Sequence, residues 1–314
     1  MAPVFAGAIY QTTYNHCTGE TMHSHSHDDN SSARIGWAFF LNVGFTIIEF
    51  VGGILTNSTA IMADAVHDLG DSLSIGLAWI LAKLGNKPAS QNFSYGYKRL
   101  SLLGSLINCI VLIAGSAWVL YQSIPRLFDP EMPVTEGMLA LSIFGIAVNG
   151  FAVFKLSKGK TLNEKVLNWH LLEDVLGWVA VFIVSVVLMF VEWPILDPIL
   201  AIGFTLFILF NVIRNLGSTL KLFLQGVPDK NLAEKIERKL KDIQEFQRFH
   251  HLHLWSLDGE HHVLTVHIEL EADVSLEDQR DLKRRLSQEL AEFDLSHTTV
   301  EFELYDEPCR DHSI

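Results

Sequence analysis

Two His-x-x-x-Asp pairs, His67 with Asp71 and His170 with Asp174, lie inside long apolar stretches of the sequence. On a helix, residues four apart project from one face about one turn from each other, so each pair presents an imidazole and a carboxylate together. An ionisable side chain at membrane depth is costly and is typical of a site that binds or moves something. Two imidazoles and two carboxylates form a suitable four-coordinate ligand set for a borderline divalent cation such as Zn²⁺. The pairs therefore predict an intramembrane metal site in a metal transporter.

Other acidic residues lie close enough in the sequence to compete for roles at such a site. Asp64 and Asp68 share the stretch of His67, and Asp64 lies one turn before it, where a carboxylate can accept a hydrogen bond from the imidazole. Spacing alone does not rank Asp68 against Asp71 as a ligand. The alternative, in which each pair is only a hydrogen-bonding group between helices, is disfavoured because two matching pairs occur on two different helices.

Two further acidic residues lie in other apolar stretches, Glu49 in the first and Asp197 in the last. Polar side chains in membrane helices commonly hydrogen-bond between helices, which contributes about 1 kcal/mol each. An ionisable residue can also line a path for ions. Both roles stay open for Glu49 and Asp197.

The composition divides the chain into an apolar part and an acidic part. The 314 residues are 49% hydrophobic and 19% charged, with a formal net charge of −13. We expect a flexible N-terminal tail over 1–33, a membrane domain over 34–224, where the text is mostly apolar, and an acidic cytoplasmic domain over 225–314. The acidic balance argues against nucleic acid as a partner, because nucleic acid favours basic patches.

The cysteines and the N-terminus add weaker signals. Cys17, Cys109 and Cys309 are scattered and form no CxxC motif, which indicates no disulfide framework and a reducing environment for the soluble part. The first thirty residues show no signal peptide. A His-Ser tract over 23–27 is either a chelating segment or an unimportant disordered tail.

Six stretches are apolar over roughly the 20 residues that a helix needs to cross a bilayer. Short connections such as Thr56-Asn57-Ser58 and Glu192-Trp193-Pro194 join antiparallel neighbours, so a compact helical bundle is expected. The stretches are Ile35–Leu55, Thr59–Leu84, Leu102–Ile124, Met138–Leu156, Leu167–Val191 and Ile195–Leu216.

The basic residues orient this bundle. Lysine and arginine accumulate in cytoplasmic connections, and the first, third and fifth connections hold Arg126 as their only basic residue. With six spans, the even-numbered connections and both termini are then cytoplasmic. The basic residues flanking the even connections are Lys83, Lys87, Lys98, Arg99, Lys155, Lys158, Lys160 and Lys165.

The sequence of the acidic tail predicts the element order α-β-β-α-β. Apolar periodicity predicts two amphipathic helices, and alternation predicts three strands around a turn at Leu257-Asp258-Gly259-Glu260. With antiparallel pairing, this order predicts a small α+β domain. The predicted elements are helices Lys230–Gln247 and Leu276–Phe293 and strands Phe249–Leu257, His262–Glu271 and Thr298–Tyr305.

Strand alternation also predicts a second metal site. Leu252 and Leu254 occupy the apolar face of the first tail strand, which leaves His251 on the other face. The same argument places His267 and Glu303 on the polar faces of their strands. These three side chains are predicted to form a cytoplasmic metal site; the alternative is a set of solvated histidines on an acidic domain.

Longer motifs resemble the cation diffusion facilitator (CDF) family, in its zinc-transporting branch. The matching text covers nearly all of the chain from Asn42 onward. It comprises Asn42-x-x-Phe45-x-x-x-Glu49-x-x-x-Gly53, Asn57-Ser58-x-Ala60-Ile61-x-Ala63-Asp64-Ala65-x-His67-x-x-x-Asp71, Phe93-Ser-Tyr-Gly-Tyr-Lys-Arg99, His170-Leu-Leu-Glu-Asp174 and Asp197-Pro198.

The resemblance implies a transport site at the two His-Asp pairs, which selects Asp71 over Asp68. It also implies a homodimer that exchanges cytoplasmic zinc for protons, with metallochaperone-like tails that bind further zinc. His251 and His267 fall at positions used in the family's tail sites, whereas Glu303 stands where histidine is common. Ser101 replaces a frequent glutamate, and the connection over 157–164 lacks a His-rich loop, which favours a bacterial-type protein of the cytoplasmic membrane.

The expected protein is therefore an integral membrane Zn²⁺/H⁺ antiporter that exports zinc. Zinc binding to carboxylate and neutral imidazole releases protons, so protonation can in turn expel the metal. Cadmium, cobalt, nickel, manganese or iron stay open as cargo, because ligand type narrows the metal without fixing it. An intramembrane metallohydrolase is disfavoured because HExxH is missing and four ligands leave no open coordination position. A non-transporting metal sensor is a further alternative, although the sequence shows no output domain.

Overall fold

The computed structural model describes residues 28–85, 87–156, 162–243, 246–271, 274–305 and 307–311. Within these ranges, side chains are described except at 28–38, 78–79, 82–83, 155–156, 162–171 and 246–247. The His-Ser tract over 23–27 lies outside the described residues.

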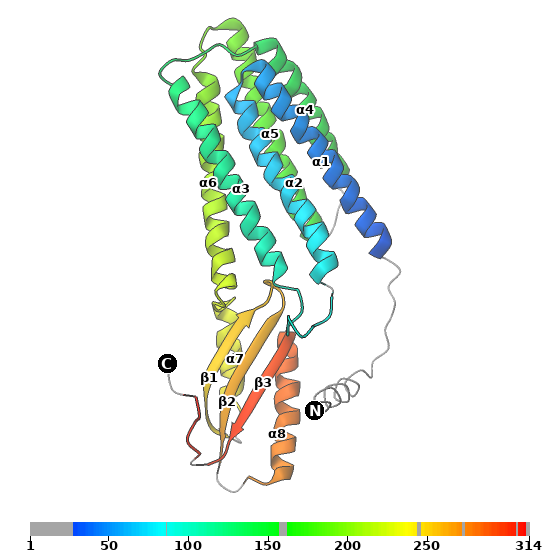
Figure 1. The fold of residues 1–314 in the computed structure, drawn as a ribbon, viewed down its shortest axis with the longest axis vertical. Coiled ribbons are helices and arrows are strands. Elements are labelled where there is room, and N and C mark those ends of the chain that lie inside the picture. Colours follow the sequence, from blue (N-terminus) through cyan, green and yellow to red (C-terminus); the bar gives the residue numbers. More distant parts are fainter. Residues whose placement is uncertain are drawn as a thin grey trace, which may run out of the picture.

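Six long helices of the described chain run side by side, above a small domain built on a sheet (Figure 1). Each of them covers one of the six stretches predicted from the sequence, which confirms the six-helix bundle. The helices are α1 (Asp28–Thr56), α2 (Thr59–Gly85), α3 (Leu100–Arg126), α4 (Thr135–Leu156), α5 (Leu162–Phe190) and α6 (Leu196–Phe223).

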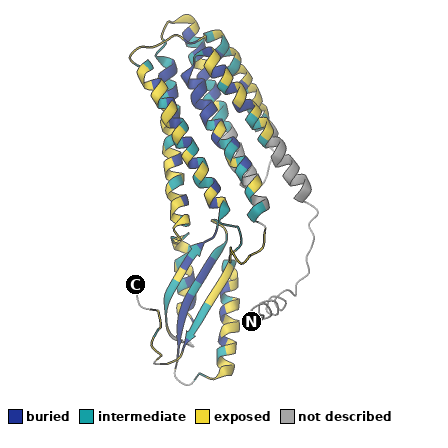
Figure 2. Ribbon diagram, viewed as in Figure 1, coloured by how far each residue is buried: buried dark blue, intermediate teal, exposed yellow. Residues whose placement is uncertain are grey.

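Five of these helices are long and apolar enough to cross a membrane, judged on the described residues alone: α1, α3, α4, α5 and α6. Helix α2 is less apolar because it carries Asp64, Asp68 and Asp71. The helices expose most of their large apolar side chains on the outside of the bundle, as expected for surfaces that face lipid (Figure 2). Helix α2 is therefore the polar helix of an otherwise apolar bundle.

Close packing joins the helices that carry the candidate site. A Cβ atom on Gly145 of α4 would lie 2.2 Å from Cδ2 of Trp178 on α5, so only glycine permits this approach. Trp178 is 1% exposed and belongs to a core that also includes Ala63 and Val66 of α2. Small residues that let helices approach closely are typical of membrane bundles. Helix α5 is thus held against both α4 and α2.

A hydrogen-bonded corner connects α1 to α2 at one end of the bundle. Asn57 has a φ of 54°, a left-handed conformation that asparagine tolerates better than most residues. The Arg126 guanidinium donates to the Asn57 carbonyl at 2.8 Å and to its side-chain oxygen at 2.6 Å. Val134 donates its amide to the Thr56 carbonyl at 2.8 Å, which also joins the start of α4 to this corner.

The domain below the bundle has the element order predicted from the sequence. Its sheet has the order β1-β2-β3, and α7 and α8 pack their leucine and isoleucine side chains on one face. Asp229 caps α7, and Ser275 forms a reciprocal capping box with Asp278 at the start of α8. The elements are α7 (Lys230–Lys241), β1 (Phe246–Ser256), β2 (His262–Leu270), α8 (Leu276–Leu290), a 3₁₀ turn (Ala291–Phe293) and β3 (Leu295–Glu303).

One strand pairing differs from the expectation. Strands β1 and β2 are antiparallel as predicted, whereas β3 runs parallel to β2, so the prediction of uniformly antiparallel pairing is wrong. The reason is the connection: α8 lies between β2 and β3 and carries the chain back along the sheet, and such a crossover joins parallel strands. The register places Val266 opposite Val300 and Ile268 opposite Phe302, on the face that α7 and α8 cover.

Candidate metal sites

Helices α2 and α5 bring three of the four predicted ligands together. Nε2 of His67 lies 3.8 Å from Oδ2 of Asp71 and 3.7 Å from Oδ1 of Asp174. One ligand atom from each residue lies within 4.8 Å of the other two. His170 lies one turn before Asp174 on α5, but its side chain is outside the described residues. The three described ligands thus form one group between α2 and α5.

The spacing of these atoms suits a divalent cation after a small contraction. Tetrahedral Zn²⁺ with bonds of about 2.0 Å holds its nitrogen and oxygen donors about 3.3 Å apart. The observed distances of 3.7 Å and 3.8 Å need a contraction of about half an ångström, which side-chain rotation can supply. The side chains of His67, Asp71 and Asp174 are 20%, 25% and 10% exposed, so the group is partly exposed and not enclosed in the protein core.

A cavity of about 220 Å³ adjoins this group. Its lining combines polar groups of α2 and α5 with aromatic side chains of α6. Asp64, His67 and Asp174 supply polar atoms, and Phe204 and Phe207 supply an apolar wall. A cation approaching His67 would meet carboxylates on one side and an apolar surface on the other.

Three of the further acidic residues predicted from the sequence lie beside the group. Asp64 is 7% exposed, Asp68 is 6% exposed and Glu49 of α1 is 1% exposed. Glu49 lies close enough to interact electrostatically with Asp68, Asp64 and Asp174, so α1 adds a buried acidic side chain behind the three ligands. Asn42 of α1 donates from its side chain to the Asp68 carbonyl at 3.5 Å. Several carboxylates thus share one small region, which attracts cations.

Asp197, in the first turn of α6, lies away from this group and contacts the start of α2. Its carboxylate accepts hydrogen bonds from the Ser58 hydroxyl at 2.6 Å, from the Thr59 amide and hydroxyl at 2.7 Å each, and from the Ala60 amide at 3.2 Å. Helix N-termini leave amide donors without partners, and a carboxylate satisfies them. Of the two roles open for Asp197, these contacts favour hydrogen bonding between helices over a place on the ion path.

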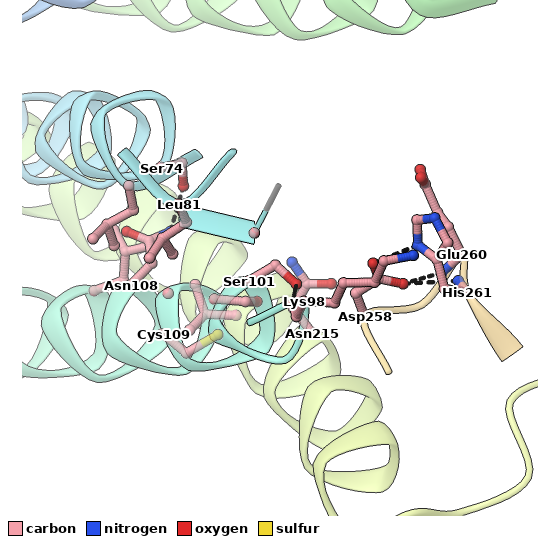
Figure 3. A pocket seen from close by; sticks show the side chains of 16 residues that line it. Ser74, Leu81, Lys98, Ser101, Asn108, Cys109, Asn215, Asp258, Glu260 and His261 are labelled. Carbon is pink, nitrogen blue, oxygen red and sulfur yellow. Dashed lines mark hydrogen bonds and ion pairs between the residues drawn. The ribbon is translucent and has the colours of Figure 1, made fainter. Parts of the chain in front are cut away.

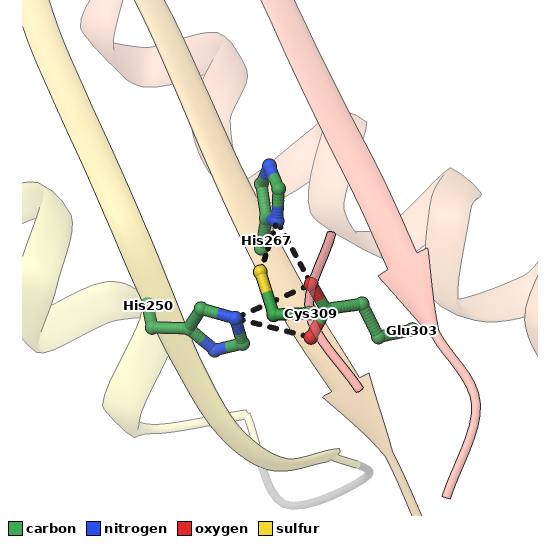
Figure 4. Close-up of side chains that lie close together, drawn as sticks. All are labelled: His250, His267, Glu303 and Cys309. Atoms are coloured by element: carbon green, nitrogen blue, oxygen red, sulfur yellow. Dashed lines mark hydrogen bonds and ion pairs between the residues drawn. The ribbon is translucent and has the colours of Figure 1, made fainter. Parts of the chain in front are cut away.

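The cytoplasmic sheet carries a second group of potential ligands on its polar face (Figure 4). His267 Nδ1 lies 2.9 Å from Oε1 of Glu303, and His250 Nε2 lies 3.0 Å from its Oε2. The Cys309 sulfur lies 3.6 Å from His267 Nδ1. We call His250, His267, Glu303 and Cys309 the tail cluster; one ligand atom from each lies within 4.8 Å of the others.

The tail cluster differs from the predicted trio in one histidine. His250, rather than His251, stands directly opposite His267 in the β1–β2 register, and residues directly opposite share a face of the sheet. A bulge between His250 and His253 interrupts the alternation, and His251 has a φ of 48° within it. The His251 ring is still close, with its centroid 5.2 Å from that of His267, but it is outside the tail cluster. The structure thus groups His250 with His267 and Glu303, and the choice of His251 as a ligand stays a prediction from the sequence.

Sequence reasoning also missed Cys309. It follows the last strand, where no alternation or helical period places it against the sheet. In the structure, Glu307 accepts the Leu304 amide at 2.8 Å and donates its own amide to the Leu304 carbonyl at 2.9 Å, which forms a turn. This turn returns the chain toward the sheet after Glu303.

The charges of the tail cluster influence each other. Burial of the Glu303 carboxyl opposes its ionisation, but hydrogen bonds from Cys309 and His267 outweigh that effect and lower its pKa. The hydrogen bond to Glu303, together with burial, raises the pKa of the Cys309 thiol. Before a metal binds, a carboxylate and a protonated thiol are therefore the favoured pair.

A larger cavity of about 750 Å³ lies between the bundle and the sheet domain (Figure 3). Lys98, Ser101 and Asn215 line it from the bundle, and Asp258 and His261 line it from the turn between β1 and β2. His261 Nδ1 lies 2.6 Å from Oδ2 of Asp258. None of the predicted ligands whose side chains the structure describes lines this cavity.

Comparison with known proteins identifies the family. A family model described as the cation efflux transmembrane domain matches residues 37–224, and one described as the cation efflux protein cytoplasmic domain matches residues 228–305. The chain belongs to the cation efflux, or cation diffusion facilitator, family. This family is one of transporters and not of enzymes, and its members cross the membrane.

Several relatives match over most of their length. The zinc transporter ZitB of Shigella flexneri is 31% identical over 299 residues, covering 91% of this chain and 93% of the relative. The metal cation efflux system protein CzcD of Cupriavidus metallidurans is 30% identical, covering 91% and 90%. The cadmium, cobalt and zinc/H⁺-K⁺ antiporter of Bacillus velezensis is 29% identical, covering 90% and 91%.

Proposed function

We propose that this protein exports zinc from the cytoplasm in exchange for protons, through a site formed by His67, Asp71, His170 and Asp174. The observation that carries this proposal is the approach of His67, Asp71 and Asp174 from two helices. A mixed imidazole and carboxylate set suits zinc, whereas hard ions such as Mg²⁺ prefer oxygen alone. The names of the relatives support zinc, cadmium and cobalt as a group of cargoes.

The coupling to protons follows from the ligands. Zinc binds neutral imidazole and ionised carboxylate, so each binding event competes with protons for the same atoms. An unperturbed histidine titrates near pH 6.5, which lets a modest change in surroundings exchange metal for protons. Glu49, Asp64 and Asp68 lie beside the ligands, so acidic side chains that can exchange protons adjoin the proposed metal site.

We further propose a homodimer in the cytoplasmic membrane of a bacterium, with both termini in the cytoplasm. The distribution of lysine and arginine supports this orientation. The expected division into a tail over 1–33, a membrane domain over 34–224 and a cytoplasmic domain over 225–314 agrees with it. The cytoplasmic domain would bind additional metal through the tail cluster.

The proposal is tested by zinc uptake into proteoliposomes that carry the purified protein and a pH gradient. We expect zinc flux that depends on the gradient and is lost in Asp174→Ala. Glu173→Gln is the matched control, because Glu173 is the neighbouring acid, is exposed, and is not part of the ligand group. Flux that persists in Asp174→Ala would overturn the assignment of the site, and cadmium or cobalt flux without zinc flux would change the cargo.

A further inference from the structure

The chain after β3 folds back across the polar face of the sheet. Arg310 pairs with Glu301 of β3 at 2.6 Å, and Asp311 lies 3.5 Å from Nε2 of His267 on β2. The turn between Leu304 and Glu307 starts this return. We call residues 304–311 the C-terminal segment; its contacts reach two of the three strands.

The segment brings a thiol to the one side of the sheet that already holds two imidazoles and a carboxylate. His267 is 8% exposed and Glu303 is 5% exposed, so both are desolvated without a positively charged side chain of Lys or Arg in the tail cluster. Arg310 pairs with Glu301 rather than with Glu303. Such a group of lone-pair donors, two of them buried and two partly exposed, is suited to hold a cation.

The distances in the tail cluster are close to those around a bound ion. Tetrahedral Zn²⁺ holds nitrogen and oxygen donors about 3.3 Å apart, and nitrogen and sulfur donors about 3.6 Å apart because the zinc–sulfur bond is longer. The tail cluster shows 2.9 Å and 3.0 Å for its nitrogen–oxygen pairs and 3.6 Å for its nitrogen–sulfur pair. The nitrogen–oxygen pairs, now at hydrogen-bond distance, need to widen by about 0.3 to 0.4 Å to hold the ion, whereas those of the membrane site need to contract.

We propose that Cys309 is a metal ligand, and that it closes a four-coordinate cytoplasmic site for a thiophilic divalent cation together with His250, His267 and Glu303. Metal binding then displaces the thiol proton to solvent and fixes the C-terminal segment to the sheet. This inference rests on the proposed function only for the choice of metal. The thiolate distinguishes this site from the membrane site, whose donors are nitrogen and oxygen, and it favours zinc and cadmium over manganese and magnesium.

The first test is a cadmium titration of the full-length protein in detergent, which reads the ultraviolet charge-transfer band of a cadmium–thiolate bond. The chain has three cysteines, so Cys17→Ser/Cys109→Ser leaves Cys309 as the only thiol. We expect a saturable band in this variant and no band once Cys309→Ser is added. A missing band in the variant that retains Cys309 would overturn the proposal.

A neighbouring pair of histidines provides the matched control. In the background that retains Cys309, His250→Ala should weaken cadmium binding about tenfold or more, whereas His251→Ala should change it less than about threefold, because only His250 is in the tail cluster. The opposite ranking would show that the ligand set is not the one assigned here. Far-ultraviolet circular dichroism of both variants checks that the sheet domain is folded.

A second readout follows the C-terminal segment itself. Hydrogen exchange measured by mass spectrometry should slow across residues 304–311 when zinc is added, and this protection should be absent in Cys309→Ser. Equal protection in the two proteins would show that the Arg310–Glu301 pair alone holds the segment, and would overturn the role of the metal. Asp71→Ala should keep both the band and the protection, so a failed transport site and a failed tail site give different results.

Discussion

The two groups of ligands in this protein are built from similar residues but held in different ways. The membrane site lies between α2 and α5, where side chains remain 10% to 25% exposed and donor atoms lie 3.7 Å to 3.8 Å apart. The tail cluster lies on a sheet, where His267 and Glu303 are less than a tenth exposed and donors lie as close as 2.9 Å. The looser group is the one that we assign to transport and the tighter group is the one that we assign to metal retention, and the supporting elements explain the difference.

The supporting elements differ in how they can move. Two helices can slide or tilt against each other with small changes in packing, which opens and closes a site between them. Paired strands are fixed by a ladder of backbone hydrogen bonds, so ligands on neighbouring strands keep their spacing. The looser geometry therefore accompanies the site that we assign to transport, and the tighter geometry accompanies the site that we assign to retention.

The largest expected effect separates the two sites completely. His67→Ala should reduce zinc flux in proteoliposomes at least 100-fold, because it removes an imidazole that lies within 4 Å of both carboxylates. Cadmium binding at the thiolate should be unchanged in the same protein. The comparison between the sites would fail if one substitution removed both signals from a folded protein.

The reverse substitution should have a smaller effect on flux. Glu303→Ala removes the carboxylate that both His250 and His267 contact, so cadmium affinity of the tail cluster should fall about tenfold or more. Zinc flux should stay within about fivefold of the unmodified protein, since Glu303 is not part of the membrane site. Flux reduced as strongly as in His67→Ala would mean that the tail cluster is required for transport and not only for retention.

Hydrogen bonds that support the helices should matter for stability more than for chemistry. Asp197→Ala leaves the amides of Thr59 and Ala60 and two hydroxyl groups without their acceptor, which should destabilise the protein by about 2 to 4 kcal/mol. A lower thermal unfolding temperature in detergent would show this effect. Ser58→Ala, which removes a single bond to the same carboxylate, should cost clearly less. Equal costs would mean that the cap acts through Ser58 alone.

The smallest effect concerns pH and the turn between β1 and β2. Burial opposes the ionisation of Asp258, but bonds from the amides of His261 and Glu260 and from the His261 side chain outweigh it and lower the pKa. A carboxyl whose pKa is lower in the folded state stabilises the fold above its unfolded pKa of about 4, and that contribution is lost as the pH falls through the folded pKa. We therefore expect the unfolding temperature of Asp258→Asn to be lower than that of the unmodified protein at neutral pH. The two temperatures should converge near pH 2. A constant difference over that range would exclude this linkage.

The sequence determined most of the membrane part because one simple rule governs it. Apolar runs of about twenty residues must become helices in a bilayer, since no water is present to satisfy the backbone. The six expected stretches accordingly overlap all six helices, with ends that differ by a few residues. Within these helices the i,i+4 spacing is enough to put His67 and Asp71 on one face. The approach of Asp174 from α5 was expected from the ligand chemistry and the family motifs, and only the tertiary structure provides the distance.

The tail shows where sequence reasoning reaches its limit. Alternation identified the core face, with Leu264, Val266 and Ile268 buried against α7 and α8. It could not locate the bulge that puts His250 in the place expected for His251, because a bulge is a property of strand pairing and leaves no period in one strand. Nor could it place Cys309, which meets His267 only through a turn beyond the last strand. Local patterns thus determined the helices and strands and the faces that they bury. The strand register and the path of the chain after β3 depend on contacts between distant residues, so the tertiary structure decided them.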